Sequence, residues 1–365
     1  MKIHLIISSL RSGGAERVVS ILANSFVKNN HDISIITFSE GDKYELDKRI
    51  KRYQLHKNLP VFNYVLCRGF INLTTFYAKK NNRPDIICSH INRMGLVTIP
   101  IAKWYGIKII SSEHTNHTFE KKTLDKLFTW NVLYKMAETI TVLTSYDLDF
   151  FKRKNSNTVV MPNPNSFTPI KKQNSHREKT IIAIGDLDRY DIKGFDNLIE
   201  IAAHLKNKFP DWKVKIVGDG NSGKKFLENL IHKNKLGNFV ELLGYRDDIK
   251  DLLRQSAIFI LTSRYEGLPM ALMEATTQGT ACISYDCISG PSDILTHNKN
   301  GFLIENQNKA KMLESLTKLM NDESLRLQLG SNAIAASSNF STERIAEKWE
   351  KLFEEILFDH HSQLK

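Results

Sequence analysis

Long apolar runs and paired cysteines are both missing from this chain of 365 residues. No apolar run approaches the roughly 18 residues that a membrane-spanning helix needs. The opening residues, 1–7, are too short for a signal peptide and are predicted to form a strand. No CxxC pair occurs among the cysteines, which are Cys67, Cys88, Cys282 and Cys287. We therefore expect reduced thiols in a cytoplasmic protein.

Acidic residues are scarce in the first half of the chain. Residues 1–165 hold 24 Lys and Arg against 13 Asp and Glu, whereas residues 166–365 hold 27 of each, so the whole net charge of +11 lies in the first half. Such a basic half can attract nucleic acid, an anionic membrane surface or an acceptor that carries pyrophosphate, or it can simply keep the surface soluble. Nucleic acid fits poorly, because no stacking or recognition motif accompanies the charge.

The chain is too long for one ordinary core and suits two domains. Both halves alternate short apolar runs with amphipathic segments, which is typical of α/β folds with doubly wound parallel sheets. Strands are predicted at 2–8, 32–38, 85–89, 108–112, 139–144 and 157–161, then at 180–185, 213–217, 240–243, 258–261 and 281–285. Helices are predicted at 15–28, 195–206, 224–235, 249–255 and 342–357.

A breaker cluster, Pro162-Asn163-Pro164-Asn165, marks the expected domain boundary and hinge. We predict two Rossmann-like domains facing across a cleft, over residues 1–164 and 165–341. The last segment, 342–365, is predicted to be a helix that packs back on the first domain.

One stretch, SRYEGLPMALMEA from Ser263, organises the second half. An apolar strand precedes it, the chain turns at Gly267, and a helix restarts with Pro269 suited to its first position. Glu266 therefore lies at the carboxyl edge of the sheet, and free N–H groups of the helix start favour an anion such as phosphate. Glu274 follows on the same helix. Two carboxylates with N–H groups between them could bind two polyols that are joined by phosphate. A nucleotide sugar has this arrangement.

A second glycine-rich loop, SGGAE at residues 12–16, follows the first strand and opens a helix. Its glycines let backbone approach a ligand, although a tight turn also needs small residues. The loop is not G-x-G-x-x-G, and no acidic residue closes the second strand, so a dinucleotide site is not supported.

Histidines follow two predicted strands of the first half. His114 lies at the carboxyl edge of one of them, where it can donate a hydrogen bond to a sugar hydroxyl or accept a proton. A lone histidine is also often structural. His90 ends the preceding strand and, with Asn92, is a weaker candidate for lining an acceptor pocket.

These motifs together resemble the retaining glycosyltransferases of family 4, which have the GT-B fold. The E-x7-E spacing of Glu266 and Glu274, its context and the GGAE loop carry the resemblance, which extends from residue 8 to residue 304. It implies transfer of a hexose or N-acetylhexosamine from a UDP-linked donor to a polysaccharide or lipid-linked glycan, with retention and without a metal or other cofactor. The segment DCISGP from Asp286 also occurs in relatives that build bacterial polysaccharides, although a surface turn explains it as well.

The resemblance also implies roles for individual residues. Glu266 would orient hexose hydroxyls, His114 would contact the hexose, and Lys193 with Arg189 would stabilise the leaving diphosphate. Helix N–H groups would hold phosphate, and Glu274 would bind ribose. The full set of implied donor-binding residues is Gly13, Gly14, Gly185, Gly218, Gly220, Tyr245, Arg246, Gly267, Leu268, Met270, Ala271 and Glu274.

One position departs from the family pattern. Asp186 stands where the family usually has an arginine on the diphosphate, and Arg189 could supply the missing charge. Asp186 and Asp188 also imitate the D-x-D of metal-dependent transferases, but that motif belongs to another fold, and a solvated loop is expected.

Two segments of the first half, 48–52 and 121–130, join basic residues to nearby apolar or aromatic ones. They could rest on the anionic inner face of the plasma membrane, or they could be packed helices with solvated basic faces. Two other functions stay open: a UDP-sugar epimerase of the same fold, and a non-catalytic subunit that binds nucleotide sugar or membrane. Asp186 is the feature that favours the second.

Overall fold

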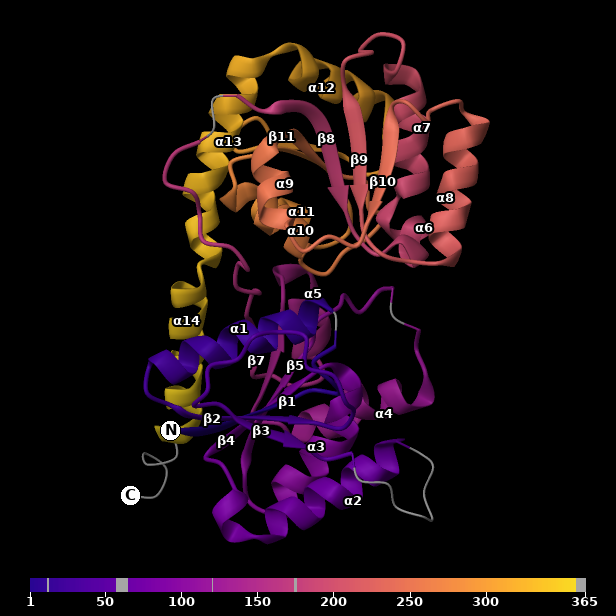
Figure 1. The fold of residues 1–365 in the computed structure, drawn as a ribbon. Helices are drawn as coiled ribbons and strands as arrows, with labels where there is room; N and C mark the ends of the chain where they lie inside the picture. The colour runs from indigo at the N-terminus through magenta and orange to yellow at the C-terminus, as the bar shows by residue number, and fades with distance from the viewer. Residues whose placement is uncertain (12, 57–64, 120, 174–175, 359–365) are drawn as a thin grey trace. The chain divides into compact units, whose positions relative to one another are not determined.

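The computed structural model describes residues 1–11, 13–56, 65–119, 121–173 and 176–358. The chain forms two compact units, Met1–Ser166 with Thr342–Lys365, and Phe167–Ser341. Each unit is built around one parallel sheet with helices on both faces (Figure 1). None of the helices in the described ranges combines the length and the apolar character that crossing a bilayer requires.

The sheet of the first unit has the strand order β3-β2-β1-β4-β5-β6-β7, with every pair parallel. Its inner strands are runs of buried β-branched residues, as expected for a sheet covered on both faces. The strands are β1 (Lys2–Ile6), β2 (Asp32–Thr37), β3 (Lys51–Gln54), β4 (Ile86–His90), β5 (Lys108–Ser112), β6 (Thr139–Val142) and β7 (Thr158–Val160).

In the part of this unit that the structure describes, six α-helices accompany the sheet: α1 (Gly14–Lys28), α2 (Val65–Ala78), α3 (Asn92–Trp104), α4 (Leu124–Asn131), α5 (Ser145–Lys152) and α14 (Thr342–Phe358). The last of them packs on α1, with the rings of Phe26 and Phe353 5.4 Å apart. Glu350 of α14 accepts hydrogen bonds from Asn29 and His31 at the end of α1. Burying each large apolar side chain of α14 contributes about 1.5–3 kcal/mol to this packing.

The sheet of the second unit has the order β10-β9-β8-β11-β12-β13, again all parallel. Its strands are β8 (Glu178–Ile184), β9 (Lys213–Val217), β10 (Val240–Gly244), β11 (Ser256–Leu261), β12 (Ala281–Asp286) and β13 (Phe302–Glu305). Its helices are α6 (Tyr190–Lys193), α7 (Phe195–Leu205), α8 (Ser222–Lys233), α9 (Ile249–Gln255), α10 (Met270–Thr277), α11 (Pro291–Ile294), α12 (Lys309–Asn321) and α13 (Glu323–Ser337).

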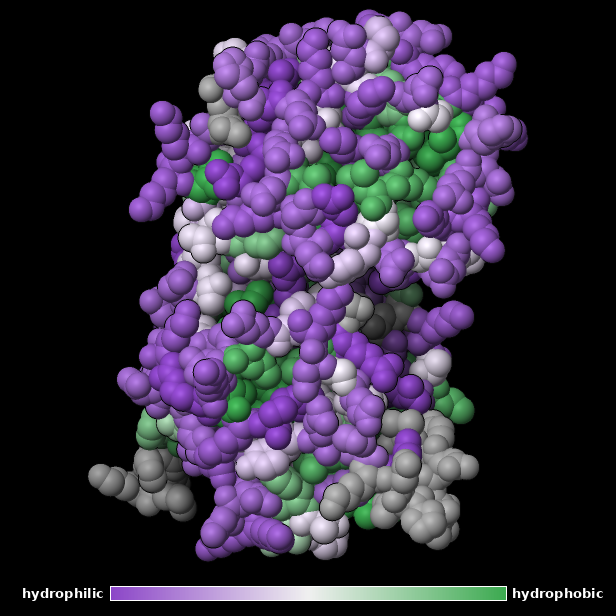
Figure 2. Space-filling model, in the orientation of Figure 1, coloured by the Kyte–Doolittle hydropathy of each residue, from purple (hydrophilic) through white to green (hydrophobic). Residues whose placement is uncertain are grey.

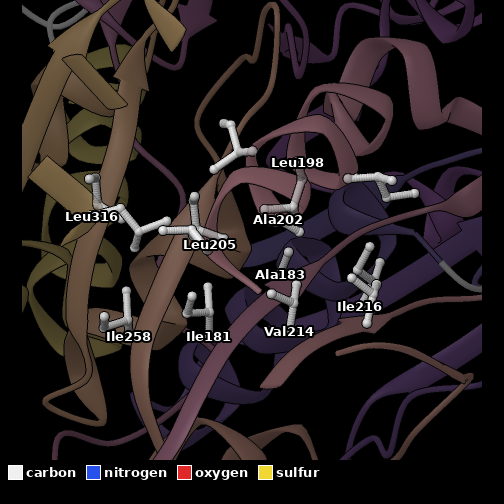
Figure 3. Packing of buried hydrophobic residues seen from close by; sticks show 14 of the residues in the cluster. Ile181, Ala183, Leu198, Ala202, Leu205, Val214, Ile216, Ile258 and Leu316 are labelled. Carbon is white, nitrogen blue, oxygen red and sulfur yellow. The ribbon is translucent and has the colours of Figure 1, made fainter. Parts of the chain in front are cut away.

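Apolar side chains from strands and helices interlock in the core of the second unit. Figure 3 shows Ile181 and Ala183 of β8 beside Val214 and Ile216 of β9, with Leu198 from α7 above them. On the face that Figure 2 shows, the surface of this unit is mainly hydrophilic, but hydrophobic residues gather between β10 and α8. That region is a groove of about 470 Å³ lined by residues such as Ile231 and Leu242, next to the edge strand.

The predicted fold class is confirmed, and every predicted strand and helix is present within about two residues of its expected ends. Two strands, β3 and β13, were not predicted. The helical alternative for residues 48–52 is wrong, because Lys51 and Arg52 begin β3. Their charges are paired inside the unit, with Lys51 on Asp32 at 2.8 Å and Arg52 on Asp42 at 2.9 Å.

Each sheet has one point where the strand order reverses direction. In the first unit it lies between β1 and β4, and in the second between β8 and β11. In folds of this kind the loops that leave neighbouring strands there diverge to opposite faces, and ligands bind at the carboxyl edge of the sheet at that point.

Candidate functional site

Three glycines line the carboxyl edge of the second sheet beside its reversal point. The Gly185 N–H donates to the Val217 carbonyl at 2.9 Å, and the Gly218 N–H donates to the Gly244 carbonyl at 3.0 Å. A Cβ atom on Gly218 would lie 1.7 Å from the Gly185 carbonyl oxygen, so only glycine fits there. At these three strand ends the backbone therefore carries no side chain.

Both aspartates of the D-x-D pattern have structural partners, Asp186 within its own loop and Asp188 in the loop that follows β9. Asp186 accepts a hydrogen bond from the Asp188 N–H at 2.9 Å. Asp188 accepts from the Gly223 N–H at 2.8 Å and from the Ser222 hydroxyl at 2.9 Å, and these bonds hold the pKa of its carboxyl below the usual value. Gly220 lies against the same loop, since its Cβ atom would be 2.7 Å from the Asp188 nitrogen. Within the described ranges, no group of three or more His, Cys, Asp or Glu side chains could hold a metal ion.

An ion pair spans the reversal point. Lys193 Nζ lies 2.8 Å from Glu266 Oε1, with side chains 20% and 10% exposed. The Ser263 hydroxyl donates to the same Glu266 oxygen at 2.6 Å. Because β8 and β11 are neighbours, the loops that follow them bring together two residues that are 73 positions apart. The predicted leaving-group cation and the predicted hexose ligand are therefore direct partners.

The turn after Glu266 leads into α10, which begins at Met270. Pro269 occupies the N-cap position, one residue earlier than predicted. The first backbone bond of the helix runs from the Met273 N–H to the Pro269 carbonyl, so the N–H groups of Met270 and Ala271 have no acceptor within the helix. Glu274, one turn further along, is only 4% exposed.

The segment that follows β12 packs against the turn after Glu266 and supports it. Its sequence is also compatible with a simple surface turn. The Ser289 hydroxyl donates to the Gly267 carbonyl at 3.0 Å, and Tyr265 forms a parallel bridge with Ile288. Gly290 has a φ angle of +100°, and a Cβ atom there would lie 2.6 Å from the Gly267 oxygen. The contact explains why a glycine and a serine occupy these positions.

Sequence reasoning missed Arg264, which ties the turn to α7. Its guanidinium pairs with both carboxylate oxygens of Asp196, at 2.9 and 2.8 Å. The pair fixes the backbone immediately before Glu266. A basic residue at a strand end was the only local signal, and its partner lies 68 positions away.

The remaining predicted donor residues differ in how they are engaged. Arg189 is exposed, and its backbone N–H donates to the Asp186 carbonyl at 3.2 Å, but its guanidinium has no hydrogen bond or ion pair with any residue that the structure describes. Tyr245 is 50% exposed, and its hydroxyl donates to Asp247 at 2.6 Å. Arg246 is paired with Asp248 by two hydrogen bonds, at 2.8 and 2.5 Å. Because the Arg246 guanidinium is already paired with Asp248, the Tyr245 ring is the better placed of these two side chains to stack on a base.

In the first unit, the GGAE loop begins α1 with Gly13 as N-cap. The Tyr44 hydroxyl accepts from the Gly13 N–H at 3.1 Å and donates to the Gly13 carbonyl at 2.8 Å. The Glu16 carboxylate covers the same point, because a Cβ atom on Gly13 would lie 2.1 Å from it. Burial raises the pKa of Glu16. The N–H of Gly13 is therefore already engaged, and Gly14 opens the helix beside it.

The two candidate histidines are direct neighbours. His90 ends β4, His114 follows β5, and His90 Nδ1 lies 3.0 Å from His114 Nε2. Burial lowers the pKa of His114 to about 4, and burial together with the neighbouring His114 holds the pKa of His90 well below its usual value. Both rings are therefore neutral at physiological pH.

A buried carboxylate lies next to this pair. Glu113 is 3% exposed and accepts hydrogen bonds from Trp130 Nε1 at 2.9 Å, from the Tyr134 hydroxyl at 2.5 Å and from the Asn92 amide at 3.1 Å. Asn92 therefore has a structural partner, and the acceptor contact suggested for it stays a prediction. His117 pairs with Asp147 at 2.6 Å in the same region.

The segment 121–130 and the adjoining Val132 expose apolar residues, of which the sequence pattern had named only Phe128. Trp130 is buried, but Leu124, Phe128 and Val132 are 87%, 50% and 46% exposed. Their spacing of four residues places them on one side of α4 and its continuation. We call these three residues the α4 stripe.

Each of the two units matches a known protein family. Residues 166–336 match the family model described as glycosyl transferases group 1, and residues 12–164 match the one described as glycosyltransferase family 4. An uncharacterised glycosyltransferase of Haemophilus influenzae is 30% identical over 95% of this chain and 98% of its own length. An α-1,4-N-acetyl-D-galactosaminyltransferase of Campylobacter jejuni, named for a glycan on PP-undecaprenol, is 29% identical over 98% and 99%. The solved structure of Anabaena Alr3699/HepE in complex with UDP has a TM-score of 0.80 at 18% identity, covering 97% of this chain and 100% of that one, which shows the same GT-B fold.

Proposed function

This chain belongs to the glycosyltransferases of group 1 and family 4, and from that premise we propose that it moves a hexose or N-acetylhexosamine from a UDP-linked donor to a hydroxyl of a polysaccharide or lipid-linked glycan, with retention of configuration. One observation carries the proposal: the Lys193–Glu266 pair lies at the reversal point of the second sheet, next to the open N–H groups of α10. A cation, an anion-binding helix start and a hydroxyl-binding carboxylate meet there, as a sugar diphosphate requires.

Each of these groups takes one part of the donor. Glu266 accepts hydrogen bonds from hexose hydroxyls, and the N–H groups of Met270 and Ala271 hold phosphate. Lys193 donates one hydrogen bond to Glu266 and keeps two further donors for the diphosphate. Glu274 binds the ribose hydroxyls from the same helix.

The transfer is proposed to proceed by front-side displacement. The bond between the sugar C1 and the diphosphate oxygen breaks while the acceptor oxygen bonds to C1 on the same face. The departing diphosphate oxygen takes the acceptor proton, so no separate base is needed. The negative charge that develops on the diphosphate is stabilised by Lys193 and by Arg189. The Arg189 guanidinium has no partner among the residues that the structure describes, which supports its role in place of the arginine usual at the Asp186 position.

We propose that no metal takes part, because these cations and helix N–H groups supply the positive charge. The capping bonds of Asp186 and Asp188 support this view, since they use the carboxylates that a D-x-D metal site would need. Full transfer in the presence of a chelator is expected. Loss of transfer that Mg²⁺ restores would contradict it.

The acceptor is proposed to be presented at the inner face of the plasma membrane. Two observations support this: the α4 stripe is exposed beside Lys121 and Lys122, and the first half carries the whole net charge of +11. Apolar side chains flanked by lysines suit an anionic lipid surface. The Campylobacter relative, whose name includes a PP-undecaprenol-linked glycan, points to the same class of acceptor.

The deciding experiment incubates the full-length protein with a panel of UDP-sugars, with and without lipid-linked acceptors, and measures UDP release and sugar products. A transferase releases UDP in step with glycosylated acceptor. An epimerase would instead convert the UDP-sugar without acceptor. A non-catalytic subunit would bind UDP and release nothing, which would refute the proposal if it held for the whole panel.

A further inference from the structure

We propose that Arg264 is a positioning residue that holds Lys193 opposite Glu266, because it binds the end of α6 and the start of α7 at the same time. The inference rests on the proposed function for the role of Lys193, which is to stabilise the leaving diphosphate. Nothing in the comparisons assigns a role to Arg264. Every contact that carries the argument lies within the second unit.

The helix that carries Lys193 is too short to hold itself in place. α6 has four residues, and the Gly194 N–H closes it by donating to the Tyr190 carbonyl. An isolated helix needs roughly 12–15 residues to be stable in water. The carbonyls of the last turn of a helix also find no donor within the helix. Contacts from outside α6 therefore decide where Lys193 lies.

The turn after β11 supplies donors for the last three carbonyls of α6. The Arg264 guanidinium donates to the Asp191 carbonyl, and the Arg264 backbone N–H donates to the Ile192 carbonyl at 2.8 Å. The Thr262 hydroxyl donates to the Lys193 carbonyl at 3.0 Å. Arginine side chains near a helix C-terminus commonly bind its last carbonyls in this way. The position of α6 is thus set by the turn that carries Glu266.

The same guanidinium also holds α7, the helix that follows. Asp196 in its first turn pairs with Arg264 through both carboxylate oxygens, at 2.9 and 2.8 Å. Burial alone would raise the pKa of Asp196, but the hydrogen bonds from Arg264 and from a backbone N–H bring that pKa below its usual value. Between the two helices, Gly194 has a φ angle of +66°, and a Cβ atom there would lie 2.0 Å from the Thr262 carbonyl oxygen. The junction of α6 and α7 therefore packs directly on the backbone next to Arg264.

The bonds of Arg264 suit it to hold the loop rather than to bind the diphosphate. Three of the five N–H donors of its guanidinium are bound to Asp191 and Asp196, and the Asp196 carboxylate neutralises its charge. A shift of α6 would move Lys193 Nζ away from Glu266 Oε1, which lies 2.8 Å from it. A misplacement of about 1 Å can lower a rate by about 10²-fold.

The kinetic test uses full-length protein and three variants. Arg264→Met is expected to lower kcat by about tenfold to a hundredfold. The Kd for UDP should stay within about threefold of wild type, because the contacts proposed for Glu274 and for the α10 N–H groups do not involve α6. Arg264→Lys, which keeps the charge without the planar fork, should recover part of kcat. Arg254→Met is the control with normal kcat, since Arg254 forms an exposed pair with Asp251 in α9 at 3.9 Å.

A double variant shows whether Arg264 acts through Lys193. In a Lys193→Met background, Arg264→Met should cause no further loss of kcat, because the group that it positions is already absent. A further loss as large as in the wild-type background would contradict the proposal. A wild-type kcat in Arg264→Met alone would also overturn it.

Hydrogen exchange followed by NMR tests the positioning without catalysis. In Arg264→Met, the Gly194 amide is expected to exchange at least about tenfold faster than in wild type. The Gly218 amide, bonded to the Gly244 carbonyl at 3.0 Å, should keep its wild-type rate and thereby show that the unit is folded. Unchanged protection of Gly194 overturns the proposal. If wild type transferred no sugar, the proposed function would fail, whereas exchange at Gly194 would still decide whether Arg264 holds the junction.

Discussion

Removing the positive charge of Lys193 separates its structural and catalytic roles. The variant Lys193→Met keeps the length of the side chain but leaves the Glu266 carboxylate, 10% exposed, with its Ser263 hydroxyl and without its cation. Breaking a fully buried ion pair costs roughly 3–5 kcal/mol, and this pair is partly open to solvent. We therefore expect the free energy of unfolding to fall by about 1–3 kcal/mol.

The loss of activity is expected to be larger than the loss of stability. The diphosphate leaves with its charge facing the Lys193 position, and removing one such preorganised donor typically costs 10²–10³-fold in kcat, or about 2.7–4 kcal/mol. The double variant Lys193→Met with Glu266→Gln removes the stranded charge. It should regain most of the stability and none of the activity.

Urea unfolding measures the free energy of unfolding, and a UDP-release assay measures kcat. Lys224→Met is the matched control, because Lys224 forms a surface pair with Glu228 at 3.9 Å in the same unit and should change stability by less than about 0.5 kcal/mol with normal activity. If Lys193→Met lost this stability but kept the wild-type kcat, Lys193 would act only by holding Glu266, and the leaving-group role would be refuted.

Other predictions follow from separate contacts. Glu274→Ala should weaken UDP binding by calorimetry at least tenfold, and unchanged affinity would rule out the ribose role. Arg189→Ala should lower kcat with little change in stability, since the structure gives this side chain no partner to lose among the described residues; an equal effect on both would contradict its assignment. Because the pKa of His114 is about 4 in the fold against 6.5 in the unfolded chain, its contribution of about 3 kcal/mol is present above pH 6.5 and lost as the pH falls toward 4. Urea unfolding at pH 7 and pH 4.5 should show this loss, and His114→Phe should reduce it. Replacing Leu124 and Phe128 by Asp should abolish co-sedimentation with anionic vesicles while leaving transfer to a soluble acceptor intact.

The strands were predictable because buried parallel strands are apolar runs, and the same rule explains why β3 was missed. β3 begins with Lys51 and Arg52, so its sequence looks like a solvated segment. Its charges are satisfied by Asp32 and Asp42, whose proximity depends on the strand order. No local pattern reports a partner that lies on the neighbouring strand.

The sequence identified individual residues of the site, but it did not show which of them contact one another. The motifs named Lys193, Glu266, His90 and His114, yet each partnership joins loops after different strands. The Lys193–Glu266 and His90–His114 contacts depend on the order of the strands in each sheet, and the spacing of residues along the chain does not encode that order.

The return of α14 to the first unit has a consequence for how the protein is made. Residues 167–341 are contiguous and leave the ribosome as a whole unit, whereas the first unit lacks α14 until synthesis has passed residue 342. Since domains fold as they emerge, the second unit can be complete while the first still exposes the apolar face of α1 that Phe353 covers. Trp349 of the same helix faces His90, so the histidine pair gains its full surroundings only in the last step of folding.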